Sequence, residues 1–245
     1  MIVKNIFRIA GALGLFAVAS FANPTSMTLT GFGDWSTLGN VYLDPYTATV
    51  GSQTNVPVIC DDWSNNTYQY ESWQVNVINL STVSDVTKGT PMFGNNQALY
   101  NELAWLGSQM MANPTSHTNQ VETSFAIWAL TYGANNTPKD PTAPLAYLQA
   151  NLPLGANDPT YLATQALLTQ AQSEGSYNGQ GWEILTPIPN TSNPSTDGLP
   201  QEFLTYVPEP SSLGVMLAFA IVAALWANRR VKALQPALEL RKLAR

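Results

Sequence analysis

Trp73-Gln74-Val75-Asn76-Val77 alternates apolar side chains at its odd positions with polar side chains at its even positions. Because successive side chains of a β-strand point to opposite faces, this alternation predicts a half-buried strand over 73–80. Shorter β-forming segments precede it, separated by glycine, Asp-Pro and Asn-Asn turn signals. They are 28–30, 41–43, 46–50, 56–59 and 68–70. Residues 27–87 therefore predict β structure.

Beyond this region the apolar spacing changes to the helical period of about 3.6 residues. The segments 97–111 and 119–132 each place their large apolar side chains on one helical face. A short helix is expected at 145–152, and another begins with Asp158 as N-cap and Pro159 at the first helical position and runs to about 173. Late strands are expected at 181–186 and 201–207. This order predicts an α+β domain, a β-sandwich or β-barrel with an inserted helical lobe.

The C-terminal part of the chain departs from this pattern. Val207-Pro208-Glu209-Pro210 precedes the uncharged apolar run 213–227, and Arg229-Arg230 follows it. Fifteen residues at ~1.5 Å each cross only part of a ~30 Å hydrocarbon core, but flanking serines can extend the helix and arginines can reach the headgroups. We expect one C-terminal transmembrane helix at 213–227; a buried core helix is the alternative that this length permits.

The order of these three features resembles the sorting tail of the PEP-CTERM family of exported bacterial proteins. The resemblance covers residues 207–230, with Val207, Pro208, Glu209, Pro210, Arg229 and Arg230 as the sorting residues. It implies that the tail holds the protein in the inner membrane until an exosortase-type enzyme processes it near Pro208–Pro210. It also implies a destination at the cell surface or outside the cell, with exopolysaccharide as a possible partner.

The N-terminus predicts a signal peptide over residues 1–22. Lys4 and Arg8 form its basic region, 9–19 its apolar region, and Ser20-Phe21-Ala22 its cleavage site, with cleavage after Ala19 as the alternative. The expected organisation is then an exported ectodomain at 23–206, the sorting signal at 207–230, and a basic cytoplasmic tail at 231–245. That tail is either an amphipathic helix on the inner leaflet or disordered.

Charges are distributed unevenly along the chain. Only Lys88 and Lys139 lie between the two terminal apolar segments, against fifteen acidic residues, so residues 23–210 carry a net charge of −13. The other cations flank the apolar segments on the side expected to face the cytoplasm. Because so acidic a domain repels phosphates, nucleic-acid binding is excluded.

Cys60 is the only cysteine of the chain, within Val58-Ile59-Cys60-Asp61-Asp62-Trp63. An intramolecular disulfide is therefore impossible, although exported proteins often form them. Three interpretations are open. Cys60 is a buried thiol that packs as a small hydrophobe at a strand end, a reactive or intermolecularly bonded thiol, or one half of a thioester-like arrangement.

The third interpretation depends on a resemblance to the thioester domains of bacterial surface adhesins, which a strand-end Cys60 and a later Ile127-Trp128 pair on a helix suggest. In that family a strand Cys and a helix Gln condense into an internal thioester that amines attack. The Gln position, four residues before the Trp, is Ser124 here, and a hydroxyl cannot supply the acyl carbon. Gln120 is one turn away, about 6 Å along the axis. The resemblance implies the architecture without the covalent bond, with Cys60 and Ser124 as the thioester-like positions.

Other side chains suggest weaker sites. Asp61 and Asp62 are candidate Ca²⁺ ligands if further oxygens such as those of Asp34 or Asp44 converge on them; a turn and cap is the simpler interpretation. His117, the only histidine, is expected in an exposed loop, and a Cys60–His117 nucleophile pair carries no family signature. The tryptophans on periodic faces are expected in the core, while one or two exposed ones would suffice to stack sugars.

No phosphate loop, dinucleotide-binding glycine pattern, His-rich metal motif or nucleophile elbow occurs, so we expect no enzymatic activity and no cofactor. The first functional hypothesis is an exported surface or extracellular-matrix protein with a non-enzymatic structural or adhesion ectodomain. A glycan-binding module is the second hypothesis, and a secreted hydrolase is the third.

Overall fold

A computed structural model describes residues 24–33, 36–83, 90–132, 143–191 and 199–207. The expected signal peptide, the residues Pro208–Pro210, the apolar run 213–227, Arg229-Arg230 and the basic tail lie outside the described residues. Within the described residues, no helix has both the length and the apolar character needed to cross a membrane.

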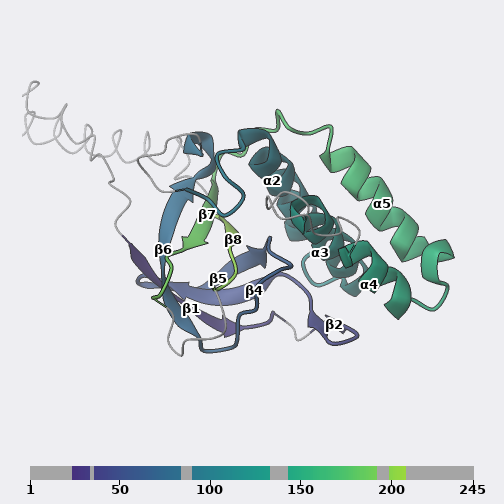
Figure 1. The fold of residues 1–245 in the computed structure, drawn as a ribbon, viewed down its shortest axis with the longest axis horizontal. Coiled ribbons are helices and arrows are strands. Elements are labelled where there is room, and N and C mark those ends of the chain that lie inside the picture. The colour runs from purple at the N-terminus through teal and green to yellow at the C-terminus, as the bar shows by residue number, and fades with distance from the viewer. Residues whose placement is uncertain (1–23, 34–35, 84–89, 133–142, 192–198, 208–245) are drawn as a thin grey trace, which may run out of the picture. The chain divides into compact units, whose positions relative to one another are not determined.

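The described chain forms a closed six-stranded barrel with a helical lobe on one side (Figure 1). The barrel order is β1-β4-β5-β8-β7-β6, and every neighbouring pair is antiparallel. Its strands are β1 (Thr25–Gly31), β4 (Tyr46–Val50), β5 (Gln53–Cys60), β6 (Ser72–Asn79), β7 (Trp182–Pro187) and β8 (Phe203–Tyr206). The short strands β2 (Thr37–Leu38) and β3 (Val41–Tyr42) pair separately. The α+β prediction is confirmed, and of the two alternatives the barrel is correct.

The helical lobe is inserted between β6 and β7, as the sequence predicts. Its helices are α2 (Gln97–Ala112), α3 (His117–Tyr132), α4 (Ala143–Asn151) and α5 (Pro159–Ala171), with 3₁₀ turns at Leu80–Thr82 and Gly155–Asn157. The start of α5 is confirmed in detail, because the Asp158 carboxylate accepts a hydrogen bond of 3.0 Å from the Thr160 N–H and Pro159 follows the cap. Helix α3 packs against α2, α4 and α5 and is the centre of the lobe.

Strand β6 shows how the barrel and the lobe share one sheet. Trp73 and Val75 are buried inside the barrel, where they pack with Met27, Leu29 and Phe203. Ile78, on the opposite face, and Leu80, in the 3₁₀ turn that follows β6, are buried in the core of the helical lobe. The predicted half-buried strand is therefore covered on both faces towards its end, because the helices pack against that part of the barrel.

Two local predictions are wrong. Residues 68–70 form a turn and not a strand: the Glu71 N–H donates to the Tyr68 carbonyl, and Tyr70 has a φ of 66°. Tyr68 and Tyr70 are both exposed, so these aromatic residues mark no sheet position. His117 does not lie in a loop but is the first residue of α3, where it is exposed.

We predict that Gly179→Ala destabilises the domain, because a Cβ at this position would overlap Cδ2 of the fully buried Leu80. The expected loss is about 1–3 kcal/mol of unfolding free energy, measured by urea denaturation of the full-length chain. Gly175→Ala is the matched control, because its Cβ would lie 3.2 Å from the Ala98 Cβ and needs only a small adjustment. Equal stability of the two variants would contradict this account.

Candidate functional site

Cys60 is the last residue of β5 and is fully buried. It pairs with Phe203 of β8 in the barrel, and its thiol donates a hydrogen bond of 3.3 Å to the Asp62 carbonyl. Burial raises the pKa of the Cys60 thiol, and the nearby carboxylates of Asp44, Asp62 and Asp61 raise it further. A thiol that is neutral and inaccessible is a poor nucleophile.

Helix α3 is attached to this strand end by side chains on one of its faces. The Trp128 indole N–H donates to the Cys60 carbonyl at 3.1 Å, and the Thr131 hydroxyl donates to the Asp61 carbonyl. Ser124, one turn before Trp128, accepts a hydrogen bond of 3.2 Å from the Asp44 N–H. Because the three side chains recur at helical spacing, a single helix face satisfies the backbone of two separate segments.

Asp44 connects the two positions that the thioester resemblance pairs. Its Oδ1 accepts a hydrogen bond of 2.8 Å from the Cys60 N–H, while its own N–H donates to the Ser124 hydroxyl. The structure therefore brings Cys60 and Ser124 to the same residue, with both side chains fully buried. A serine hydroxyl at this place makes a hydrogen bond and supplies no acyl group.

Gln120 is the nearest α3 residue that could supply an acyl group, and its amide is directed elsewhere. Its Nε2 donates a hydrogen bond of 2.8 Å to the carbonyl of Pro114, in the connection between α2 and α3. The side chain is buried in this position. The structure thus gives no support to a register shift that would bring Gln120 to Cys60.

Four carboxyl groups are buried around this junction: Asp44, Asp61, Asp62 and Glu202. Burial raises the pKa of Asp44 to about 8, and the hydrogen bond from the Cys60 N–H partly offsets this rise. Burial also raises the pKa of Asp61, with the charge of Glu202 as the next largest cause. Among the described residues, no other residue donates a hydrogen bond to either carboxyl oxygen of Asp61.

Glu202 is the better-satisfied member of this group. It accepts hydrogen bonds from the Tyr100 hydroxyl, the Thr186 hydroxyl and the Met92 N–H. Burial raises its pKa, and the hydrogen bonds from Thr186, Tyr100 and Met92 lower it. Because Tyr100 belongs to α2 and Thr186 to β7, Glu202 ties the helical lobe to the barrel.

The candidate Ca²⁺ ligands are arranged as a turn. Asp62 accepts from the Ser64 N–H at 2.8 Å and from the Asn65 side chain, which is the geometry expected of an aspartate that caps its own turn. Asp34 lies outside the described residues. In the segments that the structure describes, no three His, Cys, Asp or Glu side chains gather as a metal site would require.

His117 is not placed beside Cys60. Its Nε2 contacts the Thr37 carbonyl at 3.1 Å, at the N-terminal end of α3. Trp128, which contacts Cys60, lies eleven residues further along, or about 16 Å along the helix axis. The two side chains therefore form no nucleophile–base pair.

Most of the tryptophans are in the core, as the periodic faces predict. Trp73, Trp105, Trp128 and Trp182 are buried, and Trp63 is partly exposed. Trp63 packs in an aromatic cluster with Phe125, Trp128 and Tyr147. A hollow of about 170 Å³ beside it is small for a ligand site, since typical pockets measure about 300–1,000 Å³. Its lining is Val41, Tyr46, Asp62, Trp63, Asn65, Asn66, Trp128 and Gln201.

Sequence reasoning missed the roles of Asp44 and Glu202. Asp44 precedes Pro45 and was expected to mark a turn, while Glu202 is a single charge at the start of a late strand. The available signal was weak: a carboxylate next to a predicted strand in a chain with few cations. The sequence does not reveal which segment either residue contacts.

No protein-family model matches the chain, and no curated protein matches it. Among solved structures, the N-terminal domain of the Streptococcus pyogenes pilus tip adhesin Cpa is similar at 14% identity and a TM-score of 0.40. The N-terminal thioester domain of fibronectin-binding protein SfbI from Streptococcus pyogenes is similar at 12% identity and a TM-score of 0.41.

Each similarity covers 76% of this chain and 95% of the other domain. A likeness at this identity and TM-score does not transfer a function to this chain.

We predict that the domain loses stability as the pH rises from about 4 to about 8. The raised pKa of Asp44 means that its proton is held more tightly in the folded state than in the unfolded state, whose ordinary value is 3.8. The contribution of Asp44 is therefore complete below about pH 4 and is lost as the pH rises towards about 8. A single such group gives a slope of at most about 1.4 kcal/mol per pH unit.

Asp44→Asn should reduce this slope, measured by urea denaturation across pH 4–9. The slope falls but does not vanish, because burial also raises the pKa of Asp61 and Glu202. Asp44→Ala removes both the titrating group and the hydrogen-bond acceptor. It should be less stable than Asp44→Asn at every pH, because the Cys60 N–H loses its acceptor. Its stability should show the same reduced dependence on pH. A wild-type slope in both variants would refute the assignment.

We also predict that the Cys60 thiol is free and unreactive in the folded chain. Mass spectrometry of the intact protein should show no loss of ammonia, because Ser124 cannot form the acyl bond. A thiol-specific reagent should add once after denaturation and not before it, since Cys60 is fully buried. A mass deficit of one ammonia, or rapid labelling under native conditions, would show that the cysteine is chemically active.

Proposed function

We propose that this chain is an exported protein of the cell surface or extracellular matrix whose folded domain is a non-enzymatic structural or adhesion module. In this proposal the signal peptide at 1–22 directs export, and the segment 207–230 holds the protein in the inner membrane by the helix at 213–227. An exosortase-type enzyme then processes the chain near Pro208–Pro210. The sequence features of the two termini support this route.

The observation that carries the non-enzymatic part is the closed junction at Cys60. Cys60, the only cysteine of the chain, is buried, and the pKa of its thiol is raised. His117, the only histidine, lies at the N-terminal end of α3 and contacts the Thr37 carbonyl. Ser124 occupies the position from which an acyl group would have to come. These residues stabilise the attachment of the helical lobe to the barrel, which favours a scaffold over a hydrolase.

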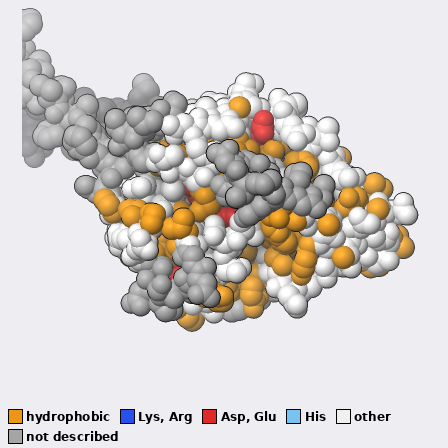
Figure 2. Space-filling view, viewed as in Figure 1, with side chains coloured by type: hydrophobic (Ala, Val, Ile, Leu, Met, Phe, Trp, Pro, Cys, Tyr) orange, Lys and Arg blue, Asp and Glu red, His pale blue; other side chains and the backbone are white. Residues whose placement is uncertain are grey.

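The distribution of charge supports the proposed orientation. The described residues contain no Lys and no Arg, because Lys88 and Lys139 fall in other segments. Figure 2 shows one face of the domain without a basic side chain and with apolar side chains spread over barrel and helices. The described part of the domain offers no cations to hold it against the acidic headgroups of a membrane, and in this proposal the terminal segments anchor the chain.

A glycan-binding module is the second candidate, and one specific observation favours it. An aromatic hollow opens between α2 and the last two barrel strands, and it is larger than the hollow beside Trp63. Its chemistry is developed in the next subsection.

We predict that sorting depends on the Pro-Glu-Pro motif. The full-length gene would be expressed in a bacterial host with and without an exosortase, followed by fractionation and mass spectrometry of the C-terminus. The wild-type chain should remain in the membrane in the host without the enzyme and lose its tail in the host with it. A variant with Pro208, Glu209 and Pro210 all changed to Ala should stay uncut in both hosts.

The matched control is Cys60→Ala, which should be exported and cut like the wild type, because the thiol has no part in sorting. Recovery of the uncut chain in the cytosol with its N-terminal segment intact would refute the export route. Hydrolytic activity of the purified chain that disappears in Cys60→Ala or His117→Ala would refute the non-enzymatic role.

A further inference from the structure

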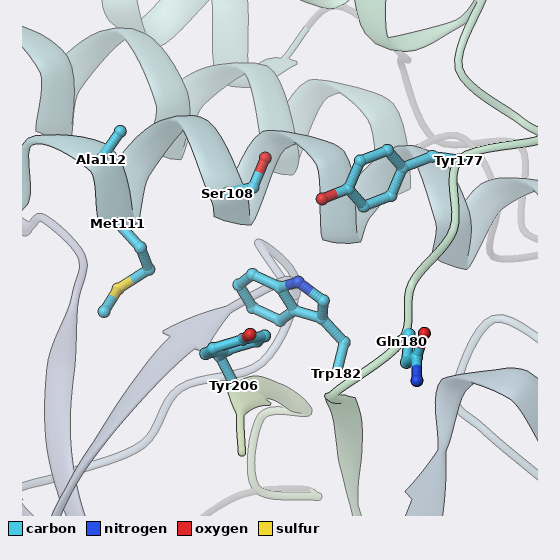
Figure 3. Close-up of a pocket in the computed structure, with 7 residues that line it drawn as sticks. All are labelled: Ser108, Met111, Ala112, Tyr177, Gln180, Trp182 and Tyr206. Carbon is cyan, nitrogen blue, oxygen red and sulfur yellow. The ribbon is translucent and has the colours of Figure 1, made fainter. Parts of the chain in front are cut away.

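A hollow of about 320 Å³ opens between helix α2 and the end of the barrel (Figure 3). Its volume is at the lower end of the range for ligand sites, about 300–1,000 Å³. Helix α2 forms one side, and the start of β7 and the end of β8 form the other. The lining residues are Ser108, Met111, Ala112, Tyr177, Gln180, Trp182 and Tyr206.

Aromatic rings form the base of this hollow. Trp182 and Tyr206 lie on the paired strands β7 and β8, with ring centroids 5.5 Å apart and planes inclined by 54°. Tyr206 is 44% exposed, so part of its ring is open to solvent, and Tyr177 enters from the loop before β7. Exposed aromatic surface beside polar groups favours ligands that have both an apolar face and hydrogen-bonding edges.

Trp182 lines the hollow although the residue as a whole is only 3% exposed. In Figure 3 its nitrogen is turned towards the side of the hollow where Ser108 and Tyr177 lie. An indole N–H that borders an open hollow can donate a hydrogen bond to a bound molecule. The hollow therefore presents a donor at its base that an oxygen of a bound molecule can satisfy.

Gly107 makes this arrangement possible. A Cβ at Gly107 would lie 2.5 Å from the Cη2 atom of Trp182, closer than two carbon atoms can approach. The bare backbone of α2 therefore lets the indole lie against the helix one turn from Met111, which lines the same hollow. The position of the ring is fixed by packing, so the N–H direction is set before any ligand arrives.

The charge of the surroundings selects the class of ligand. None of the seven lining residues is charged, and the described part of the chain contains no Lys or Arg to pair with an anion. The acidic domain around the hollow repels carboxylates, sulfates and phosphates. A neutral saccharide meets the remaining requirements: its C–H face packs on an aromatic ring, and its hydroxyls accept from an indole N–H and exchange hydrogen bonds with hydroxyl and amide groups.

We propose that the hollow between α2, β7 and β8 binds one or two rings of a neutral saccharide, with Tyr206 as the stacking surface and the Trp182 N–H as a fixed donor. This inference rests on the proposed function, since it names the ligand of the surface module. Tyr206 lies two residues before Pro208, so processing at the Pro-Glu-Pro motif leaves the site on the released domain.

The test is a titration of the full-length chain, purified in an amine-oxide detergent that carries no sugar headgroup. The probes are neutral glucose, mannose, galactose and N-acetylglucosamine oligosaccharides of two to four units, with binding followed by calorimetry and tryptophan fluorescence. At least one series should bind. Tyr206→Ala should weaken its binding about tenfold or more by removing the stacking ring, and Trp182→Phe should weaken it several-fold by removing the N–H donor together with part of the ring.

Two further variants distinguish a loss of binding from a loss of the fold. Ala112→Trp adds bulk at an exposed rim residue and should block binding without disturbing the core. Tyr70→Ala removes a tyrosine that is 70% exposed and does not line the hollow, and it should bind like the wild type. Thermal melting of each variant confirms that the fold is retained.

Absence of binding to every neutral series would overturn the proposal. It would also be overturned by undiminished binding in both Tyr206→Ala and Ala112→Trp, or by binding of acidic polysaccharides or proline-rich peptides in preference to neutral sugars. These outcomes are distinct from failure of the proposed function. A correctly sorted chain that binds no sugar refutes the saccharide site alone, whereas a sugar-binding chain left in the cytosol refutes the export route alone.

Discussion

Helix α3 is attached to the end of strand β5, and this attachment joins the helical lobe to the barrel. Trp128 bonds the carbonyl of Cys60 across 68 residues of sequence, and Ser124 bonds the N–H of Asp44 across 80. The end of a strand leaves backbone groups that the sheet does not satisfy, and burying them without partners would be costly. Helix α3 supplies those partners, and so the barrel and the helical lobe share one interior.

This solution requires carboxyl groups to be buried where the described chain offers no cation. Asp44 and Glu202 are held by hydrogen bonds from backbone and hydroxyl groups, and their raised pKa values favour the protonated form. A protonated carboxyl can be buried at far lower cost than a carboxylate. The same scarcity of basic residues shapes the surface, where aromatic and neutral polar groups, such as those around Trp182, remain as means of recognition.

The contrast between segments 73–80 and 68–70 shows what sequence patterns can predict. The alternation that begins at Trp73 is sustained over several residues, and only a pleated strand places all of its apolar side chains on one face. Residues 68–70 contain two tyrosines, which are common in strands, but three residues define no period, and the turn of Glu71 onto Tyr68 decides their conformation. Asp158-Pro159 correctly predicted the start of a helix, because an N-cap contacts only residues next to it in the sequence.

The succession of strands, helices and strands, the acidic character of the domain and the serine at position 124 could be read from the amino-acid sequence, because they are properties of neighbouring residues and of composition. The closure of the sheet into a barrel, the link that Asp44 makes between Cys60 and Ser124, and the place of Trp182 beside a hollow became visible in the three-dimensional fold. Each of these depends on segments tens of residues apart meeting in a shared interior. No local pattern encodes which of them will meet.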